Sequence, residues 1–336
     1  MQVALLVDPA GPLDAAVPDA AQYGRATNSS TRRIGSRWNS PPSRAAQLPS
    51  VIFERKSIPI VCFAVSTATI SFGTTRDGLE QLQRHWAVDA PKAAILLVHG
   101  IGEHSGRYEH VGEALTAAGY DTLGFDQRGF GKSGGRRAFV EHFTEFVDDI
   151  ADLLVERRKL GVPVVLMGHS LGGLISATYL VSDYPQPDFA VLSAPALSAK
   201  IPLWQRVAAP VLSRLVPKLH VKSGFDGSVL SRDLDAQERY DNDPLRVDGS
   251  TAALGRQILD AMKATSPAIA KIALPAYVLH GEADTLVPPS ASEPIGELPN
   301  VTRKLWAGLR HECLNEPEWP EVVAGITNWL DAQLPS

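Results

Sequence analysis

Cysteine, metal-binding patterns and positive charge are all scarce in this chain of 336 residues. Its two cysteines, Cys62 and Cys313, imply no disulfide framework and do not indicate a redox compartment. No group of Cys, His, Asp or Glu residues has the spacing of metal ligands, so we expect neither a metal nor a cofactor. The net charge of −5 argues against nucleic acid as a partner.

No hydrophobic run is long enough to cross a membrane. The most apolar stretch near the N-terminus, 58–72, has too few residues for a spanning helix, which needs about 20. Residues 1–7 have no basic flank and make a poor signal peptide. The Arg32-Arg33 pair is not closely followed by the apolar stretch of a twin-arginine signal. We therefore predict a cytoplasmic protein, at most peripheral to membranes.

The first 65 residues differ in composition from the rest of the chain. Positions 8–50 are rich in Ala, Pro, Ser and Asn and lack periodicity, which predicts a low-complexity extension over 1–65. From Thr67 onward, strand and helix patterns alternate, which predicts a mostly parallel sheet covered by helices on both faces. We expect this core at 66–196 and 263–336, with a helical cap inserted late in the sheet at 197–262.

The expected elements follow from hydrophobic periodicity. An antiparallel hairpin is predicted over 67–86, with its turn at Asp77-Gly78. Further strands are expected at 93–99, 120–125, 163–167, 189–193, 276–280 and 301–306, and helices at 108–118, 143–160, 171–183 and 321–334. In the cap, apolar residues from Ile201 to Val216 recur at near-helical spacing around a kink at Pro210, and we expect part of this stripe to be core. An apolar cap over strand ends suits an acyl chain better than a sugar or a peptide.

The most informative segment is the pentapeptide Gly-His-Ser-Leu-Gly at 168–172. It follows an apolar run at 162–167 and opens a helix-like run at 174–180, which places Ser170 at the apex of a sharp turn between strand and helix. Glycines two residues to either side leave room where strand and helix cross closely. This arrangement predicts Ser170 as a nucleophile.

Two later loops provide the expected partners of Ser170, in the chain order Ser, acid, His. Asp284 follows the strand predicted at 276–280, and His311 follows the last predicted strand. We expect Asp284 to orient His311, and His311 to take the proton of the Ser170 hydroxyl. Glu282 is a competing acid, Asp284 could instead be a turn residue before two prolines, and His311 could be a surface-loop histidine.

A glycine-rich loop at 99–108 follows the strand predicted at 93–99. Such a loop provides one backbone N–H of an oxyanion hole and the residue after the nucleophile provides the other, so we assign Ile101 and Leu171. Glu103 and Arg107 either pair near the pocket mouth and contact the substrate, or form a solvated ion pair. For the loop histidines we expect a structural hydrogen bond at His99 and surface positions at His104 and His110.

Eight segments together resemble the monoacylglycerol lipase, or lysophospholipase-like, branch of the α/β-hydrolases. They lie at 99–108, 125–133, 168–173, 192–196, 228–232, 240–245, 280–284 and 311–316, and the resemblance covers roughly residues 70 to 335. It implies Ser170, Asp284 and His311 as the catalytic triad and the Ile101 and Leu171 amides as the oxyanion hole, in agreement with the assignment above. The chain departs from the family at Gln127 and Phe130, where histidines are common, and at Cys313, where a bulkier apolar residue is usual.

We therefore predict an α/β-hydrolase fold and a serine carboxylester hydrolase. It would cleave fatty-acyl esters, monoacylglycerols or similar single-chain esters, through an acyl-enzyme on Ser170. The alternatives are an acyltransferase or thioesterase with the same triad, and a catalytically inactive binding protein of this fold. The expected partner is a small-molecule ester or lipid, with transient contact of the cap with a membrane surface as an option. No feature indicates an oligomeric state.

Overall fold

The computed structural model describes residues 68–198 and 210–334. The predicted extension at 1–65 and the first part of the apolar cap stripe, from Ile201 to Val207, lie outside the described residues.

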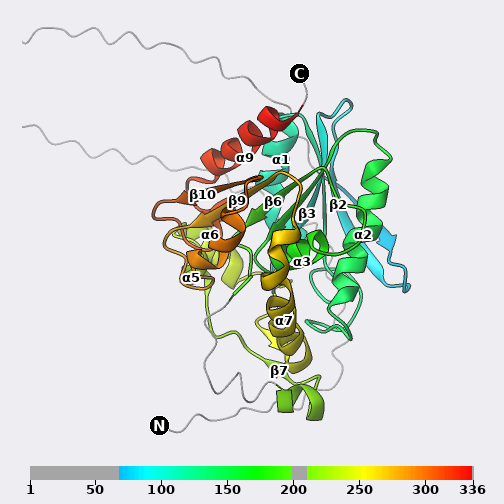
Figure 1. Cartoon of the computed structure of the whole chain (residues 1–336). Coiled ribbons are helices and arrows are strands. Elements are labelled where there is room, and N and C mark those ends of the chain that lie inside the picture. Colours follow the sequence, from blue (N-terminus) through cyan, green and yellow to red (C-terminus); the bar gives the residue numbers. More distant parts are fainter. Residues whose placement is uncertain (1–67, 199–209, 335–336) are drawn as a thin grey trace, which may run out of the picture. The chain divides into compact units, whose positions relative to one another are not determined.

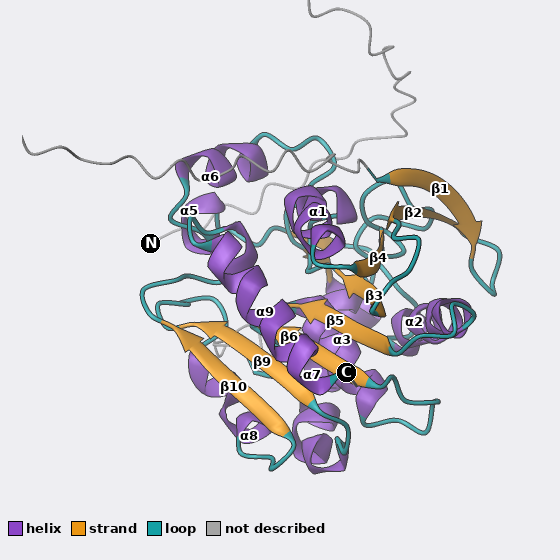
Figure 2. Cartoon of the chain, turned by 90° about the horizontal axis from the view of Figure 1, so that it is seen from above, coloured by secondary structure: helices purple, strands orange, loops and turns teal. Residues whose placement is uncertain are grey.

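An eight-stranded sheet forms the centre of the described chain, with the strand order β1-β2-β4-β3-β5-β6-β9-β10. Its strands are β1 Thr69–Thr74, β2 Glu80–Trp86, β3 Ala93–Val98, β4 Tyr120–Phe125, β5 Val164–His169, β6 Phe189–Ser193, β9 Ala276–Gly281 and β10 Val301–Trp306. β2 is antiparallel to both of its neighbours, and the pairs from β4 to β10 are parallel. Figure 2 shows β1 and β2 at one end of the sheet and β9 and β10 at the other. The predicted hairpin and parallel strands are confirmed.

Helices cover both faces of this sheet (Figure 1). The main ones are α1 Glu109–Ala117, α2 Thr144–Arg158, α3 Leu171–Leu180, α7 Ala252–Thr265, α8 Glu293–Gly296 and α9 Trp319–Gln333. All four helices expected in the core are present, with ends that differ from the prediction by one to three residues. The last one begins at Trp319 rather than 321, because Pro320 fits a first helical turn, where its missing N–H costs no hydrogen bond.

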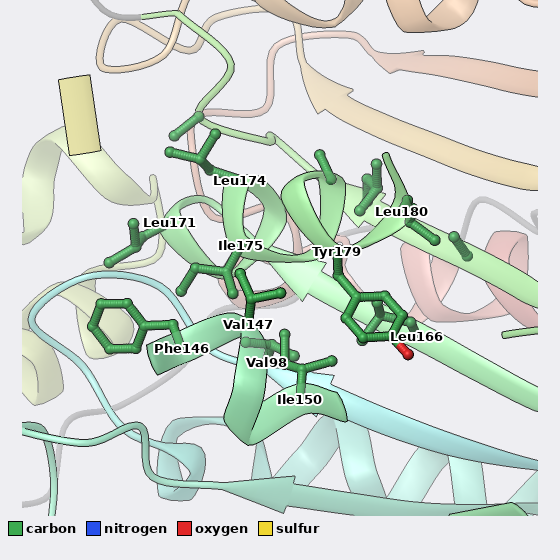
Figure 3. Close-up of a cluster of buried hydrophobic side chains, with 14 of the residues drawn as sticks. Val98, Phe146, Val147, Ile150, Leu166, Leu171, Leu174, Ile175, Tyr179 and Leu180 are labelled. Carbon is green, nitrogen blue, oxygen red and sulfur yellow. The ribbon is translucent and has the colours of Figure 1, made fainter. Parts of the chain in front are cut away.

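Side chains of the central strands alternate between two hydrophobic cores. Along β3, Ala94, Leu96 and Val98 join α2 and α3 in one core, whereas Ala93, Ile95 and Leu97 join α1 and α9 in the other. Figure 3 shows the first core, in which Val147 of α2 lies against Ile175 of α3. Every residue of β3, β4 and β5 is buried, as expected for parallel strands covered on both faces. Burial of each large apolar side chain contributes about 1.5–3 kcal/mol, so these layers fix the strand ends that carry the site.

The described part of the cap is less helical than predicted. It contains the short helices α5 Gly227–Leu230 and α6 Leu234–Asp241, and a two-stranded pair of β7 His220–Val221 with β8 Ser250–Thr251. The predicted boundary at 262 falls inside α7, which packs on α3 through Leu254 and Ala261. Three residues of the apolar stripe, Val211, Leu215 and Val216, are exposed and do not belong to the part of it that we expect to be core.

No helix in the described ranges is both long and apolar enough to cross a bilayer.

The N-terminus of α3 approaches the end of β3 too closely for any side chain. A Cβ atom on Gly172 would overlap the backbone carbonyl oxygens of Val98 and His99, which cannot move away without disturbing the sheet. Gly255, the fourth residue of α7, has only the Ser250 hydroxyl at 3.3 Å from such an atom.

We expect the substitution Gly172→Ala to lower the free energy of unfolding by about 1–3 kcal/mol or more, because the extra methyl forces α3 away from β3. The matched substitution Gly255→Ala should instead raise it by up to about 1 kcal/mol, because alanine is the better helix former. Urea unfolding followed by circular dichroism measures both. Equal stability of Gly172→Ala and the unmodified protein would contradict the close approach.

Candidate active site

Ser170 lies in a strained turn between β5 and α3. Its φ of 53° and ψ of −114° are unusual for a residue with a side chain, and such backbone strain costs about 1–3 kcal/mol. Three backbone hydrogen bonds hold the turn: Ser170 N–H donates to Ser193 O at 2.9 Å, and Ser170 O accepts from Leu174 and Ala196, both at 3.0 Å. The turn therefore holds the hydroxyl at the carboxyl end of the parallel strands.

The structure brings Ser170, His311 and Asp284 together. His311 Nε2 lies 2.8 Å from Ser170 Oγ, and His311 Nδ1 lies 2.7 Å from Asp284 Oδ2. All three residues are buried. Asp284 follows β9 and His311 follows the neighbouring strand β10, so the two loops leave the same edge of the sheet. This geometry suits transfer of the hydroxyl proton to an imidazole whose other nitrogen donates to a carboxylate.

Asp284 is held as an ionised acceptor by its own loop. Its Oδ1 atom accepts the backbone N–H groups of Leu286 at 2.8 Å and Val287 at 2.9 Å, and its Oδ2 lies 3.1 Å from His280 Nε2. Burial alone would raise the pKa of the Asp284 carboxyl, but hydrogen bonds from His280 and His311 lower this pKa well below its usual range. The competing acid, Glu282, is exposed, and Asp284 is the carboxylate that contacts His311.

The two residues assigned to the oxyanion hole lie in or next to the lining of the same pocket. Gly100, Ile101 and Ser170 all line it, and Leu171 directly follows Ser170. Within the part of the chain that the structure describes, the N–H groups of Ile101 and Leu171 have no hydrogen-bond acceptor. Unpaired donors beside a nucleophile can bind a developing negative charge.

The loop after β3 is shaped by buried contacts of its histidines. His99 lies 2.7 Å from Gly100 O through Nδ1, and its Nε2 accepts the Gln127 N–H at 2.9 Å, so its predicted structural role is confirmed. The surface positions expected for the other two are wrong. His104 Nε2 lies 2.8 Å from Asp243 of the cap, and His110 Nε2 lies 2.7 Å from Leu314 O.

Glu103 and Arg107 form a buried ion pair that also includes Glu312. Arg107 Nη1 lies 2.7 Å from Glu103 Oε2, and the guanidinium binds both oxygens of Glu312 at 2.7 Å. Glu103 Oε1 accepts the Gly100 N–H at 2.6 Å and the Tyr108 hydroxyl at 2.8 Å. Burial would raise the pKa of Glu103, but the Arg107 charge lowers it to about 2. The solvated ion pair is therefore wrong, and substrate contact by either residue stays a prediction.

The pocket above Ser170 has a volume of about 240 Å³ and two kinds of wall. Its apolar lining comes from Ile101, Phe225, Leu230 and Leu286. Its polar lining includes Glu103, His169, Tyr240, His311 and Glu312. Burial and the nearby His311 lower the pKa of His169 to about 4, so this ring is neutral at pH 7. Within residues 68–198 and 210–334, no group of three or more His, Cys, Asp or Glu side chains could hold a metal ion.

Sequence analysis missed three residues of this site: His280, Tyr240 and Glu312. Each lies in a segment that carries the resemblance. Tyr240 and Glu312 contact Arg107, which is distant in the sequence, whereas His280 contacts Asp284 only four residues later. Glu312 directly follows His311, which is the only local signal for it.

Comparisons with known proteins agree with this geometry. The family model described as "Serine aminopeptidase, S33" matches residues 89–318. The chain belongs to this hydrolase family. It is 32% identical to the monoacylglycerol lipase of Mycolicibacterium smegmatis, over 74% of this chain and 92% of that one. It is 34% identical to the human monoglyceride lipase, over 74% and 85% of the two chains. Phospholipase YtpA of Bacillus subtilis is 30% identical, over 73% and 98%.

Solved structures give the same result. The monoacylglycerol lipase of Paleococcus ferrophilus superposes with a TM-score of 0.66 at 34% identity, covering 79% of this chain and 98% of that one. A soluble variant of the Saccharomyces cerevisiae monoglyceride lipase, in complex with a substrate analog, reaches 0.74 at 21% identity, covering 82% and 99%. The predicted α/β-hydrolase fold is confirmed, and this family member is an ester-cleaving serine hydrolase of the carboxylester type. These relatives do not favour the transferase, thioesterase or inactive alternatives.

We expect Ser170→Ala or His311→Ala to lower kcat by about 10⁶, the scale found when such residues are removed from a serine protease. Asp284→Asn should cost about 10⁴, because the amide favours the wrong imidazole tautomer. Steady-state hydrolysis of a p-nitrophenyl ester measures these losses. Glu282→Gln is the matched control and should stay close to the unmodified enzyme. An inactive Glu282→Gln beside a nearly unaffected Asp284→Asn would show that the acid is wrongly assigned.

Proposed function

We propose that this hydrolase cleaves monoacylglycerols or similar single-chain fatty-acyl esters through an acyl-enzyme on Ser170. The observation that carries the proposal is the contact of Ser170 with His311 at a pocket lined by both apolar and polar residues. An ester of one fatty acid with a small polyol combines the same two kinds of group. Relatives named as monoacylglycerol or monoglyceride lipases support this substrate class.

In the proposed reaction, Ser170 Oγ attacks the ester carbonyl while His311 Nε2 takes its proton. The Asp284 carboxylate orients His311 and stabilises the imidazolium that forms. The N–H groups of Ile101 and Leu171 bind the oxyanion of the tetrahedral intermediate. His311 then protonates the departing alcohol. It next activates a water molecule, which releases the fatty acid from Ser170.

The cap sets the proposed limit on substrate size. We assign residues 197–262 to it, and its described part contributes Phe225, Leu230 and Tyr240 to the pocket lining. In this proposal, one acyl chain and a glycerol group share the pocket, whereas a second chain on the glycerol would meet the cap.

The cap also supports transient contact with an anionic lipid surface. Residues 210–222, called here the cap segment, expose Val211, Leu215, Val216, Leu219 and Val221. The exposed basic residues Arg214, Lys218 and Lys222 lie among them, and no Asp or Glu occurs in the segment. Exposed apolar side chains interspersed with cations suit an interface with acidic headgroups. Figure 1 shows β7, the end of this segment, beyond the lower end of α7 and away from the sheet.

Monoacylglycerols should be hydrolysed at least tenfold faster than di- or triacylglycerols of the same acyl chain, because the cap excludes a second chain. Binding should strengthen by about 0.8 kcal/mol per added methylene until the pocket ends. Fatty-acid release from matched substrates of increasing chain length measures both. Comparable rates on a triacylglycerol emulsion, with activation at the oil interface, would contradict the proposal.

The double substitution Lys218→Glu and Lys222→Glu should weaken binding to vesicles that contain phosphatidylglycerol by at least tenfold, since each basic residue near such a surface contributes about 1 kcal/mol. Lys159→Glu, at the exposed end of α2, is the control and should bind like the unmodified protein. Vesicle co-sedimentation gives the affinities, and thermal unfolding shows that each variant is folded. Binding that depends on neither the acidic lipid nor the double substitution would exclude this contact.

A further inference from the structure

The described residues that line the pocket include two carboxylates and no cation. Glu103 and Glu312 both line the pocket, whereas Arg107, their shared partner, does not. The other titratable residues of the lining are histidines and Tyr240. Burial raises the pKa of the Tyr240 hydroxyl to about 12, so this group is uncharged at pH 7. Together with Arg107, which lies behind the lining, Glu103 and Glu312 therefore form a group of two negative charges and one positive charge.

Among the described residues, Arg107 is the cation that both carboxylates contact, and its partners occupy it. Arg107 Nη1 contacts both Glu103 and Glu312, and Nη2 contacts Glu312 as well. The Tyr240 ring lies on the guanidinium, with its centroid 4.8 Å from the Arg107 Cζ atom. A bidentate pair of this kind is among the strongest charge-assisted hydrogen bonds, so an incoming anion would have to break it to gain a partner.

Charged groups farther from the pocket do not remove this excess of negative charge. On the other side of Tyr240 lies Arg246, 4.3 Å from the ring centroid and 3.6 Å from both Asp241 and Asp248. Behind His311, the Asp284 carboxylate adds a further negative charge. No described cation is left to neutralise an acidic group in the pocket.

The proposed proton transfer places the alcohol part of a bound ester near His311 and Glu312. Its oxygen leaves with the proton that His311 Nε2 carries, and Glu312 directly follows His311 and lines the same pocket. The apolar wall around Phe225, Leu230 and Leu286 is left for the acyl chain.

Accordingly, we infer that Glu312, with Glu103, makes the enzyme select esters of uncharged alcohols and reject esters whose alcohol carries a negative charge. This inference rests on the proposed function and names the leaving alcohol for the same site. An anionic alcohol would be buried beside two carboxylates without a counter-ion, which is a repulsive means of specificity. A phosphate-bearing lysophospholipid falls in the rejected class, and a monoacylglycerol in the accepted one.

The test uses two substrates that differ in charge and hardly in shape. One is a 1-acylglycerol, and the other is the 3-O-acyl ester of glyceric acid, in which a carboxylate replaces the terminal CH₂OH group. The ratio of kcat/KM for the glycerol ester to that for the glycerate ester should be at least about 100 in the unmodified enzyme. A p-nitrophenyl ester of the same acyl chain, with no charged alcohol, reports the common chemistry.

The substitution Glu312→Gln keeps the length and polarity of the side chain and removes one negative charge. It should lower the glycerol-to-glycerate ratio at least tenfold, whatever it does to the absolute rates. Glu316→Gln is the matched control, because Glu316 is equally buried and close in sequence but binds Arg310 and Arg232 outside the pocket. Its ratio should equal that of the unmodified enzyme. If Glu312→Gln does not fold, Glu103→Gln removes the other charge and should shift the ratio in the same direction.

A ratio near one in the unmodified enzyme, or a ratio that neither substitution lowers, overturns the inference and leaves the proposed function standing. Absence of hydrolysis of the glycerol ester, with the p-nitrophenyl ester still cleaved, overturns the proposed function instead.

Discussion

The left-handed backbone of Ser170 is the constraint on which the rest of the molecule depends. This conformation turns the chain from β5 into α3 within one residue and holds the hydroxyl at the strand ends, facing the pocket. It requires glycine at 172, because α3 and β3 touch there backbone to backbone. Its strain is tolerated because two hydrophobic cores, one on each face of the sheet, fix both flanking elements. The loops that carry Asp284 and His311 then only have to place these two side chains next to the Ser170 hydroxyl, whose position the turn already fixes.

Arg107 has a similar organising part among the loops around the pocket. Its guanidinium binds Glu103 of the glycine-rich loop and Glu312 beside His311, and it carries the Tyr240 ring of the cap on its face. One buried cation thus contacts the three segments that provide polar lining residues of the pocket. A buried charge without its partners is costly in free energy, so a displacement of one segment would also destabilise the positions of the other two.

The fold and the proposed triad could be predicted from the sequence because both rest on local patterns. Continuous apolar runs such as β3 and β5 are typical of covered parallel strands. Ser170 and Asp284 each follow such a run, and His311 follows the last predicted strand, in the expected order. The Glu312 contact could not be predicted, because Arg107 lies 205 residues away and only the folded sheet brings the two loops together. The cap was predicted poorly, because two-residue strands such as β7 and β8 have no hydrophobic periodicity. In addition, the exposed Val211 and Leu215 have the sequence spacing that is typical of a buried helix face.

The site is also divided along the chain. Ser170 and His311 are 141 residues apart, and His311 follows β10, the edge strand that is the last to be synthesised. A ribosome therefore produces the residues of the serine turn long before His311, the proposed base. A chain cut before β10 lacks the imidazole that lies 2.8 Å from Ser170 Oγ, and a serine hydroxyl without such a base is a weak nucleophile.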